Sequence, residues 1–204
     1  WLWSTGATSY DINNDNGIKA LTLVKDLVDA GSMSKEVINW TQGDVMNQFI
    51  SGNIAMMVNG PWQVPTMREQ APDLNWDVTL LPKDAEYASC LGGENFGVID
   101  GDNVDAALDF LQFATSKDEV ASYIDDFGYI AARKDVAEGQ FTDDETMQKF
   151  TEEMQYAQPR GPHAQWPEIS DALSLAVNES ITGTSTPADA AAKAQSTIDG
   201  ILAE

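Results

Sequence analysis

The sequence has few of the residues on which metal sites and nucleophilic enzymes depend. Its 204 residues include one cysteine, Cys90, and one histidine, His163. A lone cysteine excludes an internal disulfide, and its apolar neighbour Leu91 favours a buried structural thiol over a nucleophile. A lone histidine argues against a zinc site or a Ser-His-Asp triad. We therefore expect neither a metal nor a cofactor.

Basic residues and long apolar runs are also scarce. Eleven lysines and arginines face 33 aspartates and glutamates, which gives a formal net charge of −22. This charge repels phosphates and argues against binding to nucleic acid or to an anionic membrane. No run of 18 apolar residues occurs, so we expect no membrane-spanning segment. The chain opens on Trp1-Leu2-Trp3 without an initiator methionine or a signal peptide, and we expect it to be a fragment.

The apolar residues that are present recur mainly at helical spacing. Shorter apolar or alternating runs between the helices predict strands, and the mixture indicates a helix-rich α/β protein. The predicted helices cover about 16–30, 44–50, 61–70, 104–115, 117–127 and 143–156, with two more that start at Pro167 and Pro187. The predicted strands cover 54–58, 75–81 and 91–99.

Residues 51–62 hold the most informative local pattern. Gly52 suits the left-handed position after a helix, and Ile54 to Val58 form a short apolar run typical of a buried strand. Asn59 or Gly60 can cap the next helix, and Pro61 fits its first helical position.

Trp62 then lies in the first turn of that helix, at the carboxyl end of the predicted strand. Ligands bind at this edge of open α/β sheets, and an indole can cover the apolar face of a sugar ring. The alternative is that Trp62 only fills the core beside the strand. The local pattern leaves both interpretations open.

The segment Gly92-Gly93-Glu94-Asn95 is a second candidate site. Paired glycines within a strand mark a bulge or the close approach of another group. A ligand hydroxyl could reach this bare backbone, where Glu94 and Asn95 offer acceptors and a donor. The alternative is a bend in the strand at a hinge or corner.

Trp166 is the third candidate, because it immediately precedes the proline that starts a helix. Like Trp62, it pairs an indole with helix-start amides, although it could instead form a hydrophobic staple. Two tryptophans in this setting, together with a glycine-rich strand, suit a carbohydrate ligand, because aromatic faces cover C–H groups while polar groups bind hydroxyls.

The stretch from Asp44 to Trp62 resembles the central motif of family 1 extracellular solute-binding proteins. These are the maltose-binding-protein-like receptors of bacterial ABC sugar importers. The resemblance continues in order through five further segments, although Ala131 replaces the proline of the family's Gly-Tyr-Leu-Pro-x-Arg pattern. These segments are 76–82, 91–95, 107–116, 128–134 and 159–173.

The resemblance implies the helix-rich portion of a type II periplasmic-binding-protein fold. Residues 1–90 and 136–204 would belong to the C-terminal lobe, and 91–135 would cross the hinge and pack on the N-terminal lobe. Such a receptor lies outside the cytoplasm, as a lipoprotein or in a periplasm. It binds an oligosaccharide between its lobes, docks on an ABC transporter permease, and is not an enzyme. The ligand-binding residues would be Trp62, Gly60, Pro61, Gly92, Gly93, Glu94, Asn95 and Trp166.

The resemblance also implies an apolar face that the N-terminal lobe would cover, including Phe110, Leu111, Tyr123 and Phe127. We expect a chain without that lobe to rearrange or to self-associate through this face. Alternatives for the function are a glycan-degrading enzyme domain, a solute-binding protein for a ligand other than sugar, and an interaction domain with buried tryptophans.

Overall fold

The computed structural model describes residues 1–203, which divide into two units. Unit 1 comprises Trp1–Thr41, Leu81–Leu91 and the chain from Glu153 onward. Unit 2 comprises Gln42–Leu80 and Gly92–Glu152. Over residues 1–203, none of the helices combines the length and the hydrophobicity that crossing a membrane requires.

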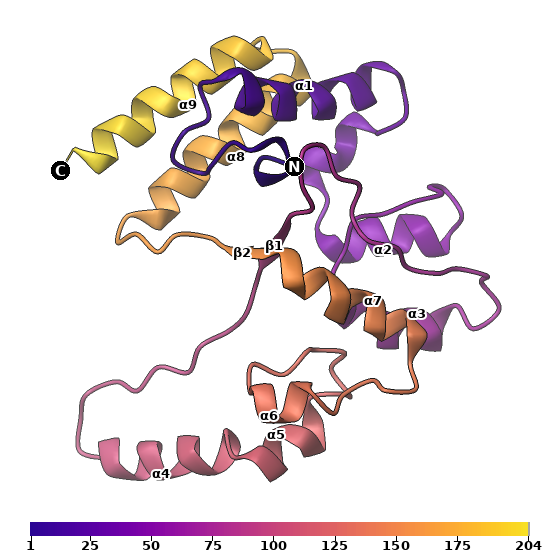
Figure 1. Cartoon of the computed structure of the whole chain (residues 1–204), viewed down its shortest axis with the longest axis vertical. Helices are drawn as coiled ribbons and strands as arrows, with labels where there is room; N and C mark the ends of the chain where they lie inside the picture. The colour runs from indigo at the N-terminus through magenta and orange to yellow at the C-terminus, as the bar shows by residue number, and fades with distance from the viewer. Residues whose placement is uncertain (204) are drawn as a thin grey trace. The chain divides into compact units, whose positions relative to one another are not determined.

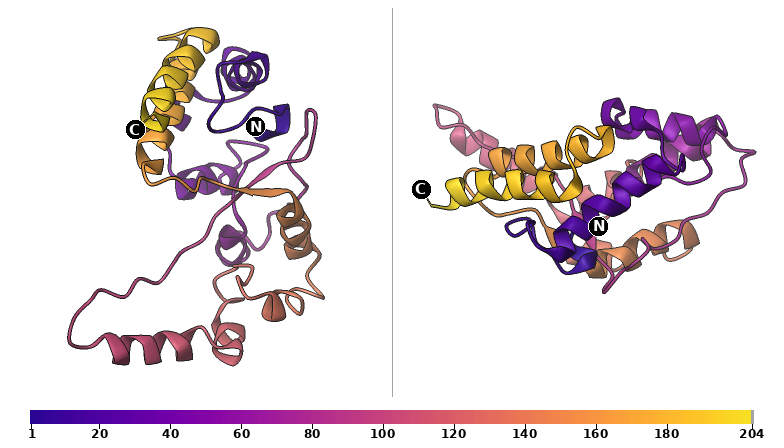
Figure 2. Two further views of the ribbon diagram at one scale, coloured as in Figure 1. Left: turned by 60° about the vertical axis from the view of Figure 1, so that its left-hand side comes forward. Right: turned by 90° about the horizontal axis from the view of Figure 1, so that it is seen from above.

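Three helices form the core of unit 1 (Figures 1 and 2). Helices α1 (Asp15–Asp29), α8 (Trp166–Thr182) and α9 (Pro187–Leu202) pack on one another. Their contacts are made mostly by small side chains, which let the helix axes approach closely, with isoleucine and leucine filling the rest. The buried cluster contains Ile12, Leu21, Ile169, Ala172, Ala176, Ala190, Ala191, Ala194 and Ile198.

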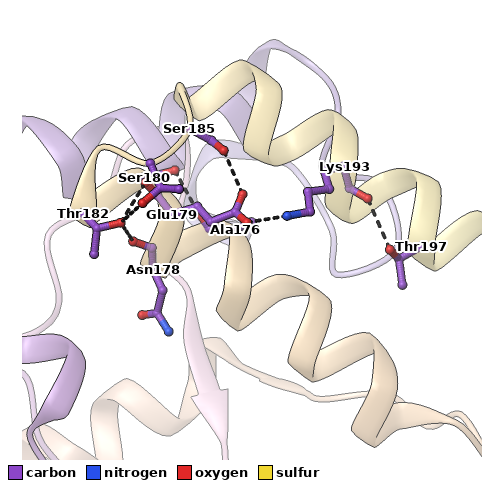
Figure 3. Close-up of polar contacts among 9 residues, drawn as sticks. Ala176, Asn178, Glu179, Ser180, Thr182, Ser185, Lys193 and Thr197 are labelled. Atoms are coloured by element: carbon purple, nitrogen blue, oxygen red, sulfur yellow. Dashed lines mark hydrogen bonds and ion pairs between the residues drawn. The ribbon is translucent and has the colours of Figure 1, made fainter.

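Polar contacts fasten the hairpin between α8 and α9 (Figure 3). Glu179 of α8 accepts hydrogen bonds from Lys193 of α9 and, at 2.9 Å, from the hydroxyl of Ser185 in the connecting loop. These two donors hold the pKa of the Glu179 carboxyl below its ordinary value. The buried Ser180 hydroxyl is satisfied within α8, where it donates to the carbonyl of Ala176 at 2.8 Å.

Local signals set the starts of two of these helices, of which the sequence analysis predicts the one at Pro187. The Asn14 side chain caps α1 by accepting from the Gly17 amide at 3.0 Å, and Thr186 caps α9 by accepting from the Asp189 amide at 3.1 Å. Such caps satisfy amides that the helix itself leaves without partners. The remaining elements of unit 1 are η1 (Trp3–Thr5), η2 (Lys35–Asn39), β1 (Ser89–Leu91), η4 (Met154–Tyr156) and β2 (Ala157–Pro159).

Unit 2 consists of short helices joined by long connections. They are α2 (Gln42–Ile50), η3 (Pro61–Gln63), α3 (Val64–Gln70), α4 (Val104–Ala114), α5 (Lys117–Tyr123), α6 (Lys134–Ala137) and α7 (Glu145–Glu153). Each predicted helix of this region is present, and the predicted helix after Pro61 divides into η3 and α3. Gly52 takes the left-handed conformation expected after α2, with φ of 73°.

Ser116 and Thr142 precede the predicted helices at 117–127 and 143–156, and the preference for hydroxyl side chains at N-caps predicts that they cap them; both predictions are wrong. Ser116 precedes α5 but makes no side-chain capping hydrogen bond there. Asp144, rather than Thr142, caps α7, because its Oδ1 accepts from the Met147 amide at 3.1 Å. Arg68 of α3 donates to both oxygens of this carboxylate, at 2.7 and 2.8 Å. This bidentate contact lowers the pKa of the Asp144 carboxyl below its ordinary value, and the hydrogen bond from the Met147 amide makes a smaller contribution in the same direction.

The strand predictions are largely wrong. Among the described residues the sheet contains only β1 and β2, which pair in parallel from Ser89–Ala157 to Leu91–Pro159. Residues 54–58, 75–81 and 92–99 form no strand. Met56 and Val58 are 86% and 60% exposed rather than buried. A strand requires a neighbour with which to exchange backbone hydrogen bonds, and none of the described residues provides one for these runs.

Two surface features also bear on the predictions. Cys90 is exposed on β1, so the expected buried thiol is wrong. The central residues of α4 are also exposed, because Leu108, Phe110 and Phe113 retain 52%, 60% and 58% of their surface and no residue of α4 is buried. Of these three residues, Phe110 belongs to the surface for which we expect self-association.

Candidate functional site

The Trp62 side chain lies at the start of a helical segment, as predicted. Gly60 is the N-cap of η3, Pro61 follows it, and Trp62 is the next residue. The six-membered ring of the indole lies directly against Gly60, since a Cβ placed there would be 2.1 Å from Cη2 of Trp62. Val64 and Met67 of α3 are buried and anchor the segment. The structure therefore brings Gly60, Pro61 and Trp62 together.

The approach to this turn is fixed by Asn59. Its Oδ1 accepts from the Gly60 amide at 3.0 Å, and its Nδ2 donates to the carbonyl of Gln42 at 2.9 Å. Asn59 thereby ties the turn to the first residue of α2. A turn held at both ends positions an indole more reproducibly than a free loop does.

A second aromatic residue contacts the indole, and the sequence analysis missed it. The ring centroids of Trp62 and Tyr129 lie 6.0 Å apart with an interplanar angle of 39°. Tyr129 is 6.5 Å from Phe127, which in turn lies 6.2 Å from Tyr123. Tyr129 lies in the Gly-Tyr segment that carried the family resemblance, but no local pattern links it to Trp62.

The glycine segment follows β1 and is open. A Cβ placed on Gly92 or Gly93 would meet no atom within 4 Å. The side chains of Glu94 and Asn95 are exposed. The backbone here is accessible, as a ligand contact would require, although β1 ends at Leu91 and the strand predicted for 91–99 is absent beyond it.

Trp166 belongs to unit 1, where it is the first residue of α8. Its amide donates to the carbonyl of His163 at 3.1 Å. The ring of Tyr10 meets the indole edge-on at 6.4 Å and lies 6.5 Å from His163. Trp166 and Trp62 are both half-buried, so neither is a fully enclosed core residue.

The Tyr10 segment is fixed by Gln195 of α9, which the sequence analysis also missed. The Gln195 amide group donates to the carbonyl of Tyr10 at 3.0 Å. Its carbonyl oxygen accepts from the amides of Ile12 and Asn13, at 2.8 and 3.3 Å. A single side chain from the last helix thus holds the loop that brings Tyr10 to Trp166.

Each set of contacts is confined to its own unit. Gly60, Pro61 and Trp62 meet in unit 2 and Trp166 meets Tyr10 in unit 1, so the joining of the predicted residues in one cleft stays a prediction. Among residues 1–203 no cluster of three His, Cys, Asp or Glu side chains could hold a metal ion.

The chain matches a known family over most of its length. Residues 2–149 match the family model described as bacterial extracellular solute-binding protein. The chain belongs to this family. The solute-binding fold also extends beyond the matched residues, because solved structures of such proteins align with 98% of the chain.

Two of these structures are most informative. An ABC transporter solute-binding protein from Thermotoga lettingae, bound with α-D-tagatose, is 26% identical and superposes with a TM-score of 0.84 over 98% of this chain and 54% of its own. Maltose-bound MalE3 of T. maritima is 23% identical, with a TM-score of 0.83 over 98% of this chain and 56% of its own. These likenesses confirm the predicted fold class.

Two further matches also cover nearly all of this chain and about half of the matched protein. A substrate-binding protein of Listeria monocytogenes in complex with cycloalternan has a TM-score of 0.78 at 20% identity, over 99% of this chain and 55% of its own. A binding protein of Brucella abortus is 27% identical over 95% of this chain and 50% of its own length. This solute-binding chain therefore spans about half the length of the curated relatives it matches.

Proposed function

We propose that this chain is part of a receptor that binds a carbohydrate and delivers it to an ABC transporter permease. The observation that carries the proposal is the half-buried Trp62 indole, held over the bare backbone of Gly60 at a helix start. An indole fixed in this way offers an apolar surface to the C–H groups of a sugar. The solved relatives bound with tagatose, maltose and cycloalternan support this ligand class.

The other predicted residues complete the proposed site. Gly92 and Gly93 would offer backbone groups to sugar hydroxyls, with Glu94 and Asn95 beside them. Trp166, supported by Tyr10, would form a second apolar surface. We propose an oligosaccharide as the ligand, as the relatives bound with maltose and cycloalternan support. The site would bind and release its ligand without catalysis, outside the cytoplasm, as the family description supports.

We expect Trp62→Ala to weaken sugar binding strongly. Removal of a central aromatic contact costs about 2 kcal/mol or more, which corresponds to a roughly 30-fold rise in Kd. Calorimetric titration of the full-length protein with maltose, tagatose and cycloalternan would measure the loss. Trp76→Ala is a matched control, because Trp76 is another half-buried tryptophan of unit 2.

Two outcomes would contradict the proposal. One is the absence of heat with every sugar in the wild type, and the other is turnover of a chromogenic glycoside, which would favour the enzyme alternative.

Delivery to a permease is tested in cells that lack the gene. Uptake of the bound sugar should return with the wild-type gene and not with the Trp62→Ala variant.

We also propose that the 204-residue chain self-associates through the exposed face of α4. Phe110 and Phe113, three residues apart on one side of α4, are 60% and 58% exposed, and exposed apolar patches mark interaction sites. Sedimentation equilibrium should give a mass that rises with concentration, and a Phe110→Asp, Phe113→Asp double variant should remain monomeric. A wild-type chain that is monomeric at every concentration would contradict this prediction.

A further inference from the structure

The Trp62 indole occupies the space that a side chain at position 60 would need. A Cβ at position 60 would lie 2.1 Å from Cη2 and 2.3 Å from both Cζ2 and Cζ3 of Trp62. These distances are well below van der Waals contact, so the ring lies flush against the Gly60 backbone. Gly60 therefore limits the indole on one side but cannot hold it laterally.

The segment that carries Tyr129 is packed against the same turn. Gly128 is buried and has φ of 66°, a left-handed conformation that favours glycine. A Cβ on Gly128 would lie 2.8 Å from both the carbonyl oxygen of Pro61 and Cδ of Pro65. This close approach brings the ring of the following residue, Tyr129, close to the indole, with 6.0 Å between the two ring centroids.

Gln140 prevents the Tyr129 segment from moving away. Its Nε2 donates to the carbonyl of Tyr129 at 3.1 Å and also to Oδ1 of Asp125. Its Oε1 accepts from the Ala131 amide at 2.8 Å. One side chain thus fixes the backbone at Tyr129 and at Ala131, two residues further on, which keeps the phenol ring beside the indole.

We propose that Tyr129 is a positioning residue, which holds the Trp62 indole in its binding orientation before the ligand arrives. This inference rests on the proposed sugar-binding role of Trp62. A side chain that is already ordered loses less conformational entropy on binding than one that must be immobilised by the ligand. Tyr129 therefore raises affinity through Trp62, without a contact of its own to the sugar.

The first test measures the order of the indole in the ligand-free, full-length protein. With 5-fluorotryptophan incorporated, the fluorine resonance of Trp62 is identified by its loss in Trp62→Phe. In Tyr129→Leu this resonance should shift and broaden, because the indole samples several orientations. In Tyr129→Phe it should stay as in the wild type, since the aromatic ring is retained.

The second test measures affinity with maltose as the probe, or with tagatose or cycloalternan if maltose does not bind. If the ligand has to immobilise the indole on binding, Kd should rise about three- to tenfold. We expect this rise for Tyr129→Leu and not for Tyr129→Phe. Gln140→Ala should produce the same shift and the same loss while leaving the ring in place. This variant keeps the proposal testable should Tyr129→Leu fail to fold.

Tyr123→Leu is the matched control, because Tyr123 contacts Phe127 rather than Trp62. It should leave both the Trp62 resonance and the affinity unchanged. A folded Tyr129→Leu or Gln140→Ala protein with a wild-type Trp62 resonance would overturn the inference. If no sugar binds the wild type, the proposed function fails, and the ligand-free resonance by itself decides whether Tyr129 orders Trp62.

Discussion

Replacement of Gly17 by alanine is expected to destabilise unit 1 by about 3 kcal/mol, the upper end of the usual cost of overpacking. The new Cβ would lie 2.0 Å from the carbonyl oxygen and 2.7 Å from the carbonyl carbon of Ile12. Both are backbone atoms, so no side-chain rotation can relieve the collision. Either the first turn of α1 or the Ile12 backbone, which Gln195 also binds, must move.

The result is informative because helix propensity predicts the opposite sign. Alanine in a helix interior is ordinarily more favourable than glycine by about 1 kcal/mol. Gly200→Ala in α9 is the matched control, since its Cβ would meet nothing within 4 Å. Urea unfolding should show a lower midpoint for Gly17→Ala and an equal or higher one for Gly200→Ala. Equal midpoints for the two variants would contradict the close approach of α1 to Ile12.

The second large effect is expected at Ile198. This side chain is 0% exposed and lies among the alanines of α8 and α9, where it is one of the few large groups. Ile198→Ala removes buried methyl groups and leaves a cavity, which costs about 2–5 kcal/mol. We expect a value near the middle of this range, about 3 kcal/mol, because the neighbouring alanines are too small to fill the space.

Ile99→Ala makes the same chemical change at a position that is 91% exposed. It should alter stability by less than about 0.5 kcal/mol, as surface substitutions usually do. The difference in unfolding midpoint between the two variants measures the contribution of burial alone. A loss below 1 kcal/mol for Ile198→Ala would mean that α9 does not pack on α8 and α1 as described.

The helices could be predicted from the sequence because their signals are local. Asn14 and Thr186 accept from amides three residues ahead, so the cap and the helix it starts are read from one short stretch. Pro187 fits the first turn of α9 for the same reason, since its missing N–H is not needed there. The exception is α7, where Arg68, distant in sequence, reinforces a cap at Asp144.

The strands could not be predicted in the same way. The residues from Asn75 to Leu80 alternate between exposed and half-buried, as their polar and apolar pattern indicates. They nevertheless form no ladder, because pairing depends on a second segment that a local pattern does not reveal. Only β1 finds such a partner among the described residues, and that partner, β2, is 68 residues further along the chain.

In the candidate site, too, the local contacts could be predicted from the sequence and the contacts between distant segments could not. Gly60, Pro61 and Trp62 are adjacent in sequence, and their local arrangement was predicted. Tyr129 reaches Trp62 from 67 residues away, through the close contact of Gly128 with Pro61. Gln140 and Gln195 carry no local signal, because a glutamine that fixes a loop resembles any surface glutamine until its partners are known.

The contacts of Gln195 with residues 10–13 also determine when α1 can complete its folding during synthesis. They join positions more than 180 apart in sequence, and Ile198 completes a core that begins with Ile12. On the ribosome, the apolar face of α1 can therefore be fully covered only after α9, roughly 180 residues later, has been synthesised. At roughly 5–20 residues per second this delay is on the order of ten seconds or more, during which that face is available to chaperones and to aggregation.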